Sequence, residues 1–282
     1  MASGRKRHAS PQALSYPQRR YEAAQGWGVS SPLLDWLRKQ TSSWTPSIVG
    51  VFREDAVHPW PLTANSAKEL RTRLTTTGHL LPLPAEPAAL ANVMEIELRK
   101  HLLEAVALTR DAQVAEGTER SYPDLEFGGS LFGNGFRAVD IKCARRNKTR
   151  TALQNRIALY TGNTYFLWPQ LKFSGIRRPF GEYEELISVV VMYTFEPDVP
   201  ERITDVVVAV HETWRIASRA RASATREYIG SIGNIENLVA GRGDFNSAKD
   251  FYDYWRHSTR NWKKSPEAER LLRRAIDAKR DE

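Results

Sequence analysis

Residues Tyr122–Ala144, YPDLEFGGSLFGNGFRAVDIKCA, hold two runs of alternating apolar and polar residues around a glycine-rich turn. The alternation predicts strands near Pro123–Phe127 and Phe136–Ala144. Gly128–Gly135 between them is typical of a turn that links two strands, and it lacks the lysine and following helix of a phosphate-binding loop. We therefore expect this stretch to lie within a β-sheet.

The second run, FRAVDIKCA, divides its side chains between two faces. In a strand, Val139, Ile141 and Cys143 point to one side, and Asp140 and Lys142 point to the other. The first set is apolar and suits a core. The Cα atoms of Asp140 and Lys142 would lie roughly 7 Å apart, which lets both side chains reach one phosphate group.

Asp124, at the start of the first run, is placed to approach the same point from across the turn. Phosphodiester hydrolysis needs a metal that polarises the phosphate and acidifies a water molecule, and a cation near the developing charge. Two close carboxylates repel each other unless a hard cation such as Mg²⁺ lies between them. The three residues therefore fit the centre of a metal-dependent hydrolase.

The Asp-x-Lys triplet alone does not decide between catalysis and chance. A chain of this length holds about two Asp/Glu-x-Lys triplets at ordinary residue usage. A second one, Asp277–Lys279, lies in a charged segment of helical pattern and is typical of a solvated helix face. The strand pattern and the upstream Pro123-Asp124 favour Asp140 and Lys142.

Periodicity predicts the remaining elements. Pro87 begins a helix that runs to about Thr109, and strands rich in valine and isoleucine are expected at Leu186–Phe195 and Asp205–Ile216. Ser47–Leu62 has the pattern of a hairpin. Together they predict an α/β (α+β) fold with a central mixed β-sheet flanked by helices.

Three regions of the chain differ in pattern. Residues 1–28 are rich in Arg, Ser, Gln and Pro and are expected to form a flexible basic arm. Residues 29–264 are expected to form one folded domain that includes the hairpin at about residues 47–62. Residues 265–282 are expected to form a helical tail, which Ser265-Pro266-Glu267 begins.

Composition narrows the class of protein. Of 282 residues 41% are hydrophobic, which is enough for a substantial core, and a formal net charge of +8 suggests a polyanionic partner such as nucleic acid. A basic protein can also simply be soluble. One cysteine, Cys143, excludes a disulfide framework and a cysteine-rich zinc site. No stretch has the apolar length of a membrane span or the core of a signal peptide, so we expect a cytoplasmic protein without a membrane partner.

Four blocks of the chain are similar to one nuclease family. YPDLEFGGSLFGNGFRAVDIKCARRNK resembles the active-site segment of the PD-(D/E)xK superfamily and, within it, of the EcoRV-like type II restriction endonucleases. RIALYTGNTYF, RRPFGEYEELISVVVMYT and IGSIGNIENLVAGRGDFNSAKDFYDYWR are similar to the later segments, in order, within Gly50–Arg260. The resemblance implies a restriction-endonuclease-like fold in a bacterial cytoplasm.

The resemblance implies roles for the site residues. Asp124 and Asp140, together with Ile141, would be ligands of Mg²⁺, for which Mn²⁺ would be a substitute, and Lys142 would orient the attacking water and stabilise charge on the phosphate. A further acidic ligand is implied on an upstream helix. Glu95 matches its spacing, Glu97 is the rival, and either can be an ordinary solvated helix carboxylate.

The stretch that reads DNA in the family keeps its length here but changes its residues. Ala222-Ser223-Ala224-Thr225-Arg226 replaces the glycine-rich recognition loop, so a different DNA sequence is expected to be read. Arg226, with help from Arg221, would pair with guanine, or the two arginines would hold phosphates. The full set of expected DNA contacts is Ala222, Ser223, Thr225, Arg226, Arg221, Arg120, Arg145, Thr164 and Trp255. For Trp255 the alternative is an ordinary core residue.

The resemblance implies a Mg²⁺-dependent type II restriction endonuclease. It would act as a homodimer on double-stranded DNA, cut a GC-containing palindrome of about six base pairs, and leave blunt ends with 5′-phosphates. A DNA methyltransferase that protects the same site would be its genetic partner. Two alternatives stay open, a repair or recombination nuclease of the same superfamily and a DNA-binding protein that does not cut.

Overall fold

The computed structural model describes residues 31–46, 65–66, 68–69, 87–118, 121–196, 203–226, 228–257 and 266–278. The expected basic arm and the expected hairpin lie outside these residues. No helix within the described ranges is long and apolar enough to cross a membrane.

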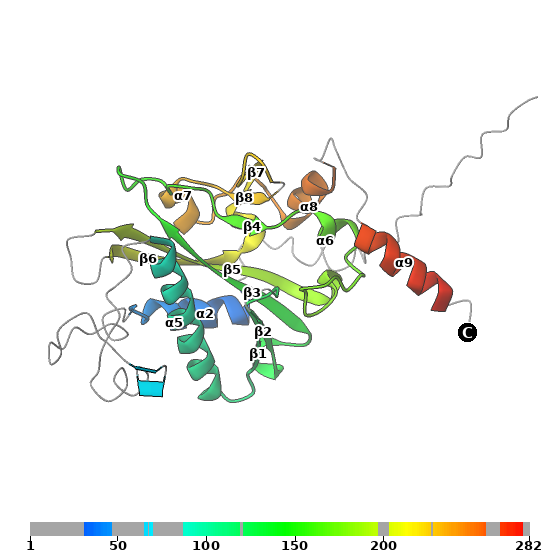
Figure 1. The fold of residues 1–282 in the computed structure, drawn as a ribbon, viewed down its shortest axis with the longest axis horizontal. Coiled ribbons are helices and arrows are strands. Elements are labelled where there is room, and N and C mark those ends of the chain that lie inside the picture. Colours follow the sequence, from blue (N-terminus) through cyan, green and yellow to red (C-terminus); the bar gives the residue numbers. More distant parts are fainter. Residues whose placement is uncertain are drawn as a thin grey trace, which may run out of the picture.

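The centre of the molecule is a five-stranded mixed sheet in the order β1-β2-β3-β5-β6 (Figure 1). The long strands β3 and β5 run parallel, and the other neighbouring pairs run antiparallel. This arrangement confirms the predicted mixed sheet. The strands are β1 (Gln113–Glu116), β2 (Leu125–Gly128), β3 (Phe136–Arg145), β5 (Tyr183–Phe195) and β6 (Ile203–Glu212).

Helices α2 (Pro32–Ser42) and α5 (Pro87–Ala107) cover one face of this sheet (Figure 1). Ser31 caps α2 by accepting a hydrogen bond from the backbone N–H of Leu34, and Pro32 fits the first helical turn. One side of α5 contributes a fully buried stripe at the predicted helical spacing. Its members are Leu90, Met94, Leu98 and Leu102.

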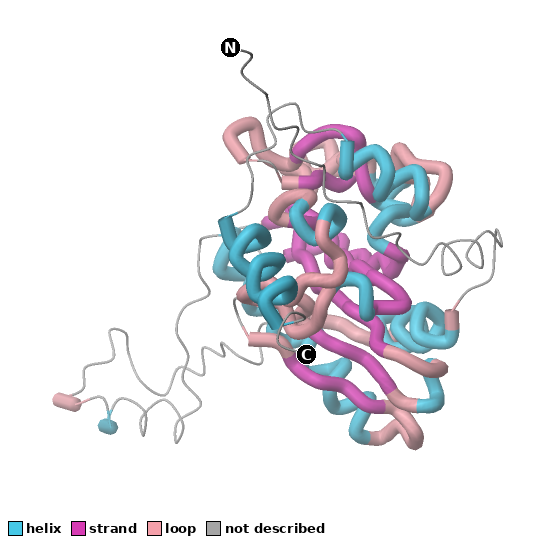
Figure 2. Tube along the Cα trace, turned by 90° about the vertical axis from the view of Figure 1, so that its right-hand side faces the viewer, coloured by secondary structure: helices cyan, strands magenta, loops and turns pink. Residues whose placement is uncertain are grey.

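A second layer covers the opposite face (Figures 1 and 2). It holds a three-stranded antiparallel sheet in the order β4-β8-β7 and is packed largely by aromatic rings around Phe166 and Phe251. Its elements are β4 (Ala158–Tyr160), α6 (Thr164–Leu167), β7 (Ala217–Arg221), β8 (Ile229–Ser231), α7 (Ile235–Val239) and α8 (Ala248–His257). Helix α9 (Pro266–Ala278) begins at the predicted Pro266.

The predicted strand Asp205–Ile216 is partly wrong. Strand β6 pairs with β5 only as far as Glu212, and the chain then forms a 3-10 turn, η4 (Thr213–Ile216), before it enters β7 of the second layer. The buried hydroxyl of Thr213 donates to the carbonyl of Leu186 at 3.1 Å, which ties the turn to β5. A valine-rich run shows where a strand can form, but it does not show where the chain changes sheets.

The glycine-rich turn between β2 and β3 contains a short 3-10 helix, η2 (Ser130–Phe132), and buries Phe132. Gly129 before it has a φ of 97°, and an added Cβ would lie 2.3 Å from the carbonyl oxygen of Asp111. Only glycine fits both constraints. The turn therefore brings β2 and β3 together as neighbours, as predicted.

The packing of α5 gives a stability prediction. Leu98 is 0% exposed, whereas Ile96, two residues away on the same helix, is 56% exposed. Leu98→Ala should lower the free energy of unfolding by about 2–5 kcal/mol, because it removes buried methyl groups and leaves a cavity. Ile96→Ala should change it by less than about 0.5 kcal/mol. Urea unfolding measures both, and equal losses would contradict the assigned face of α5.

Candidate active site

Strand β3 brings together the three residues that the sequence singled out. Val139 and Ile141 point into the core beneath α5, and Asp140 and Lys142 point to the other face, as the alternation predicted. The Nζ atom of Lys142 lies 2.8 Å from Oδ2 of Asp140 and 3.9 Å from Oδ2 of Asp124. One ammonium group therefore bridges two carboxylates that come from neighbouring regions of the sheet.

The length difference between β2 and β3 explains how Asp124 is held. Pairing of the two strands ends at Leu125 and Val139, so β3 continues beyond the reach of β2 on that side. The amide of Ile141 instead donates to Oδ2 of Asp124 at 2.6 Å. Buried backbone amides need partners, and the carboxylate takes the place of the missing strand. Asp124 is thereby fixed against the backbone beside Lys142.

Glu95 has the same structural role two residues further along β3. Its Oε1 accepts a hydrogen bond of 3.0 Å from the amide of Cys143. The carboxylates of Asp124, directly before β2, and of Glu95, on α5, thus bind the amides on both sides of Lys142. Glu97 is two residues further along α5, where the helix has turned by about 200°. The geometry favours Glu95 over Glu97 as the acidic group nearest Lys142.

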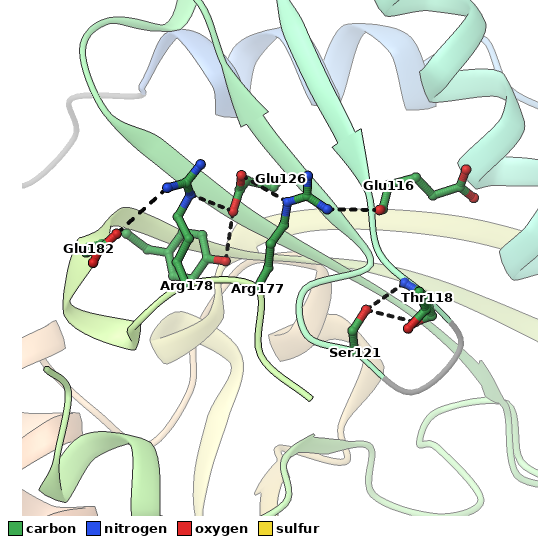
Figure 3. A network of polar contacts seen from close by, with 8 residues as sticks. Glu116, Thr118, Ser121, Glu126, Arg177, Arg178 and Glu182 are labelled. Atoms are coloured by element: carbon green, nitrogen blue, oxygen red, sulfur yellow. Dashed lines mark hydrogen bonds and ion pairs between the residues drawn. The ribbon is translucent and has the colours of Figure 1, made fainter. Parts of the chain in front are cut away.

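Strand β2 is anchored immediately beyond Asp124 by a buried carboxylate, Glu126 (Figure 3). Its two oxygens lie 3.2 Å from Nε of Arg177 and 2.9 Å from Nε of Arg178, and the hydroxyl of Tyr183 donates to it at 3.0 Å. Arg177 also donates to the carbonyl of Glu116 at 3.2 Å. A buried charge with this many partners fixes the strand that carries Asp124.

Burial and neighbouring charges shift the pKa values of the residues in this cluster. Burial raises the pKa of Asp140 to about 7, with Lys142 opposing the rise and Asp124 adding to it. Burial also raises the pKa of Glu95, again against the effect of Lys142. Burial alone would lower the pKa of Lys142, but Asp140, Asp124 and Glu95 together raise it. Lys142 is therefore a cation at neutral pH.

The donor groups fit a hard divalent cation. Within the described ranges no three His, Cys, Asp or Glu side chains form a ready-made metal cluster. The nearby donors are oxygens of Asp124, Asp140 and Glu95, and Ile141, whose side chain is a hydrocarbon, can offer only its backbone carbonyl. Mg²⁺ takes one or two protein carboxylates and keeps several waters, so this set suits it.

Two open cavities meet at Lys142. One, of about 360 Å³, is lined by Asp124, Asp140, Lys142 and Tyr160, among others. The other, of about 720 Å³, adds Glu95, Arg145 and Arg156 to its lining. We call the two cavities together the groove. Lys142 and Ala158 line both halves, so the cluster lies where the halves join.

The sequence reasoning missed several groove residues. Tyr122 and Tyr160, whose buried hydroxyls interact with each other, line the smaller cavity, and Arg156 lines the larger one. Tyr122 directly precedes the Pro-Asp pair and was within reach of a motif-based argument. Tyr160 reaches the site because β4 pairs with β8, and Arg156, shortly before β4, is bonded to Ser231 of β8. Local pattern does not reveal such contacts between distant segments.

The expected recognition residues lie at the tip of the second layer. Ala222, Ser223, Thr225 and Arg226 belong to the connection that follows β7, and Arg221 ends that strand. The Ser223 hydroxyl accepts hydrogen bonds of 3.2 Å from the amides of Thr225 and of Arg226, which gives this loop a defined turn. Nη1 of Arg226 donates to the hydroxyl of Tyr228 at 2.9 Å.

The other expected DNA contacts have mixed outcomes. Arg145 ends β3 and lines the groove, with its guanidinium 5.1 Å from the ring centroid of Phe195. Thr164 begins α6 and is half-buried. Trp255 is only 3% exposed and packs in the aromatic core, which supports a core role and contradicts a direct DNA contact. Arg120 lies outside the described residues.

Comparison with known proteins agrees with this geometry. The family model described as restriction endonuclease EcoRV matches residues 58–274. Among curated proteins, the chain is similar to the type II restriction enzyme EcoRV from Escherichia coli, at 25% identity over 204 residues. This similarity covers 66% of the chain and 81% of that enzyme.

The raised pKa of Asp140 gives a pH prediction. Between about pH 4, the ordinary value for the unfolded chain, and about pH 7, Asp140 binds more protons in the folded state, so its contribution lowers the free energy of unfolding as pH rises. Asp140→Asn should flatten this fall. His211, whose pKa burial lowers, contributes the opposite slope in both proteins, so it cancels in the comparison.

Urea unfolding in the presence of a chelator, at several values between about pH 5 and about pH 7.5, measures the two slopes. Parallel pH profiles for the wild type and Asp140→Asn would contradict a raised pKa at this position.

Proposed function

The chain belongs to the EcoRV family of restriction endonucleases, and from this membership we propose that it is a Mg²⁺-dependent type II enzyme that hydrolyses both strands of a short palindrome in duplex DNA. The observation that carries the proposal is the Asp124–Lys142–Asp140 cluster where the two halves of the groove join. A half-buried cluster of this kind, with amides held on both sides, suits transition-state charge better than structural packing.

Asp124 and Asp140 would hold Mg²⁺, with Glu95 and the carbonyl of Ile141 as further donors, and Mn²⁺ would be a substitute. When bound, the cation would polarise the phosphate and lower the pKa of the attacking water. Asp124 and Glu95 also bind the β3 amides, which keeps the cluster rigid while the substrate enters.

Lys142 would serve as a cation and hydrogen-bond donor rather than as a base. The surrounding carboxylates raise its pKa, so it keeps its proton at neutral pH. Its ammonium group would orient the water and stabilise negative charge on the phosphate as the bond to the 3′-oxygen breaks. That bond cleavage leaves the phosphate on the 5′ end of the product.

The substrate and assembly follow from the same proposal. A homodimer with two-fold symmetry would present two such sites to the two strands of a palindrome. We propose a GC-containing site of about six base pairs, cut to blunt ends. The altered loop at Ala222–Arg226 supports a site different from that of EcoRV. A cognate DNA methyltransferase would protect the host.

Loss of the side chain of Asp140 or of Lys142 should slow DNA cleavage strongly. Asp140→Ala and Lys142→Ala should each lower the rate of plasmid cleavage in Mg²⁺ by at least about 10²–10³-fold, because each removes charge stabilisation of the transition state. Asp277→Ala, in the second Asp-x-Lys triplet, is the matched control and should keep the wild-type rate. Normal cleavage by both active-site variants would overturn the assignment, and activity limited to branched or mismatched DNA would indicate a repair nuclease.

Arg226 should read a base. Arg226→Ala should reduce discrimination at one base pair by about 1–3 kcal/mol, because the bidentate contact with guanine is lost. Binding to unrelated DNA should hardly change, and Arg242→Ala, on an exposed arginine paired with Glu236, is the control. Competition binding at several salt concentrations separates the two roles. Equal weakening for all DNA sequences would mean that Arg226 holds a phosphate.

A further inference from the structure

One wall of the groove is the segment Arg156–Ala158, at the start of β4. Arg156 and Ile157 line the cavity that holds Glu95, and Ala158 lines both cavities on either side of Lys142. In the fold, β4 lies against β8, which pairs with β7 (Figure 1). The wall of the catalytic groove thus adjoins the hairpin that carries the proposed recognition loop.

Hydrogen bonds join this wall to both strands of the hairpin. Nη1 of Arg156 donates to the hydroxyl of Ser218 on β7 at 2.7 Å and to the carbonyl of Ser231 on β8 at 3.3 Å. The amide of Ile157 donates to the hydroxyl of Ser231 at 3.1 Å, and the amide of Ser231 donates back to the carbonyl of Ile157 at 2.9 Å. The guanidinium of Arg156 therefore spans both strands.

Ser218 links the side chain of Arg156 to β7 and to Asp244. It is 2% exposed, and its hydroxyl donates to Oδ2 of Asp244 at 2.8 Å while it accepts from Arg156 and from the amide of Ala220 at 3.0 Å. A serine hydroxyl has one donor and two acceptor sites, and all three are in use. The same Asp244 oxygen accepts the amide of Arg219 at 2.8 Å. These bonds set the course of β7 directly before the recognition loop.

Arg156 has donors left over for a second partner. The residue is exposed, and its bonds to Ser218 and Ser231 use only Nη1. Holding a long side chain in one conformation costs conformational entropy. The fixed position of Arg156 therefore favours a functional role for this side chain. Nε and Nη2 belong to the same rigid guanidinium plane at the groove wall, where a DNA phosphate would pass.

We propose that Arg156 is a positioning residue that couples the recognition hairpin to the catalytic groove. This inference rests on the proposed nuclease function. When the enzyme binds a duplex of the correct sequence, the duplex fixes β7 and β8. Ser218 and Ser231 then fix the guanidinium of Arg156. The guanidinium holds a phosphate so that the scissile bond reaches Lys142. A duplex with a wrong sequence binds without this alignment. Arg156 and Ser218 therefore contribute to specificity at the cleavage step.

The test compares cleavage with affinity in the full-length protein. Ser218→Ala, Arg156→Gln and their double variant are assayed with site DNA, using single-turnover cleavage in Mg²⁺ and equilibrium binding in Ca²⁺. Each single variant should slow cleavage by about 3- to 30-fold, with a much smaller change in Kd. The double variant should be no slower than the worse single variant, because both changes break one connection. Arg156→Lys should restore some of the rate.

Arg150→Gln is the matched control, because Arg150 lies in the same connection but pairs with Glu196 and Asp205 at the other end of the sheet. It should leave the rate unchanged. Equal losses in rate and affinity, or multiplied losses in the double variant, would overturn the coupling. If Ser218→Ala does not fold, as thermal unfolding would reveal, the Arg156 variants decide alone.

Hydrogen exchange gives a readout that does not need cleavage. Site DNA should slow amide exchange in residues 156–160 of the wild type and should slow it much less in Arg156→Gln. Equal slowing in both would contradict the coupling. A wild type that binds DNA without cutting it would contradict the nuclease assignment, while the exchange result would still judge the link between hairpin and groove.

Discussion

The site depends on two backbone amides of β3 that lie beyond the reach of β2. Strand β2 stops pairing with β3 at Leu125, and the amides of Ile141 and Cys143 would otherwise be left without partners. Asp124 and Glu95 bind them. Because the edge of β3 needs hydrogen-bond acceptors, one carboxylate from directly before β2 and one from α5 lie on either side of Lys142. The same bonds that complete the sheet assemble the acidic cluster.

This arrangement lowers the stability of the fold, and it places charged groups where a phosphate and a cation would bind. Asp140 is buried, and the attraction of Lys142 only partly offsets the combined effect of this burial and of the repulsion from Asp124. A core built for stability alone would not place three carboxyl groups around one ammonium. The surrounding framework compensates with apolar packing beneath α5 and with the network around Glu126. The cluster is therefore held in place by groups that do not enter the chemistry.

The strand alternation was enough to predict which side chains of β3 face the core and which face the groove. The mixed sheet and helix α5 were also within reach, because period and length are local properties. The change of sheet after Glu212, the groove role of Arg156 and the choice between core and DNA contact for Trp255 were not. Each depends on contacts between segments that are far apart in the sequence. Glu95 could be separated from Glu97 only when α5 was placed against Cys143.

The most direct test of site-specific cleavage by this cluster is to sequence the fragment ends from one plasmid digested by the wild-type protein in Mg²⁺. We expect all ends to carry 5′-phosphates and to derive from a single palindromic sequence that differs from the EcoRV site. Ends without a common sequence would contradict site-specific cleavage. Uncut DNA under conditions where the protein binds it would contradict the nuclease assignment as a whole.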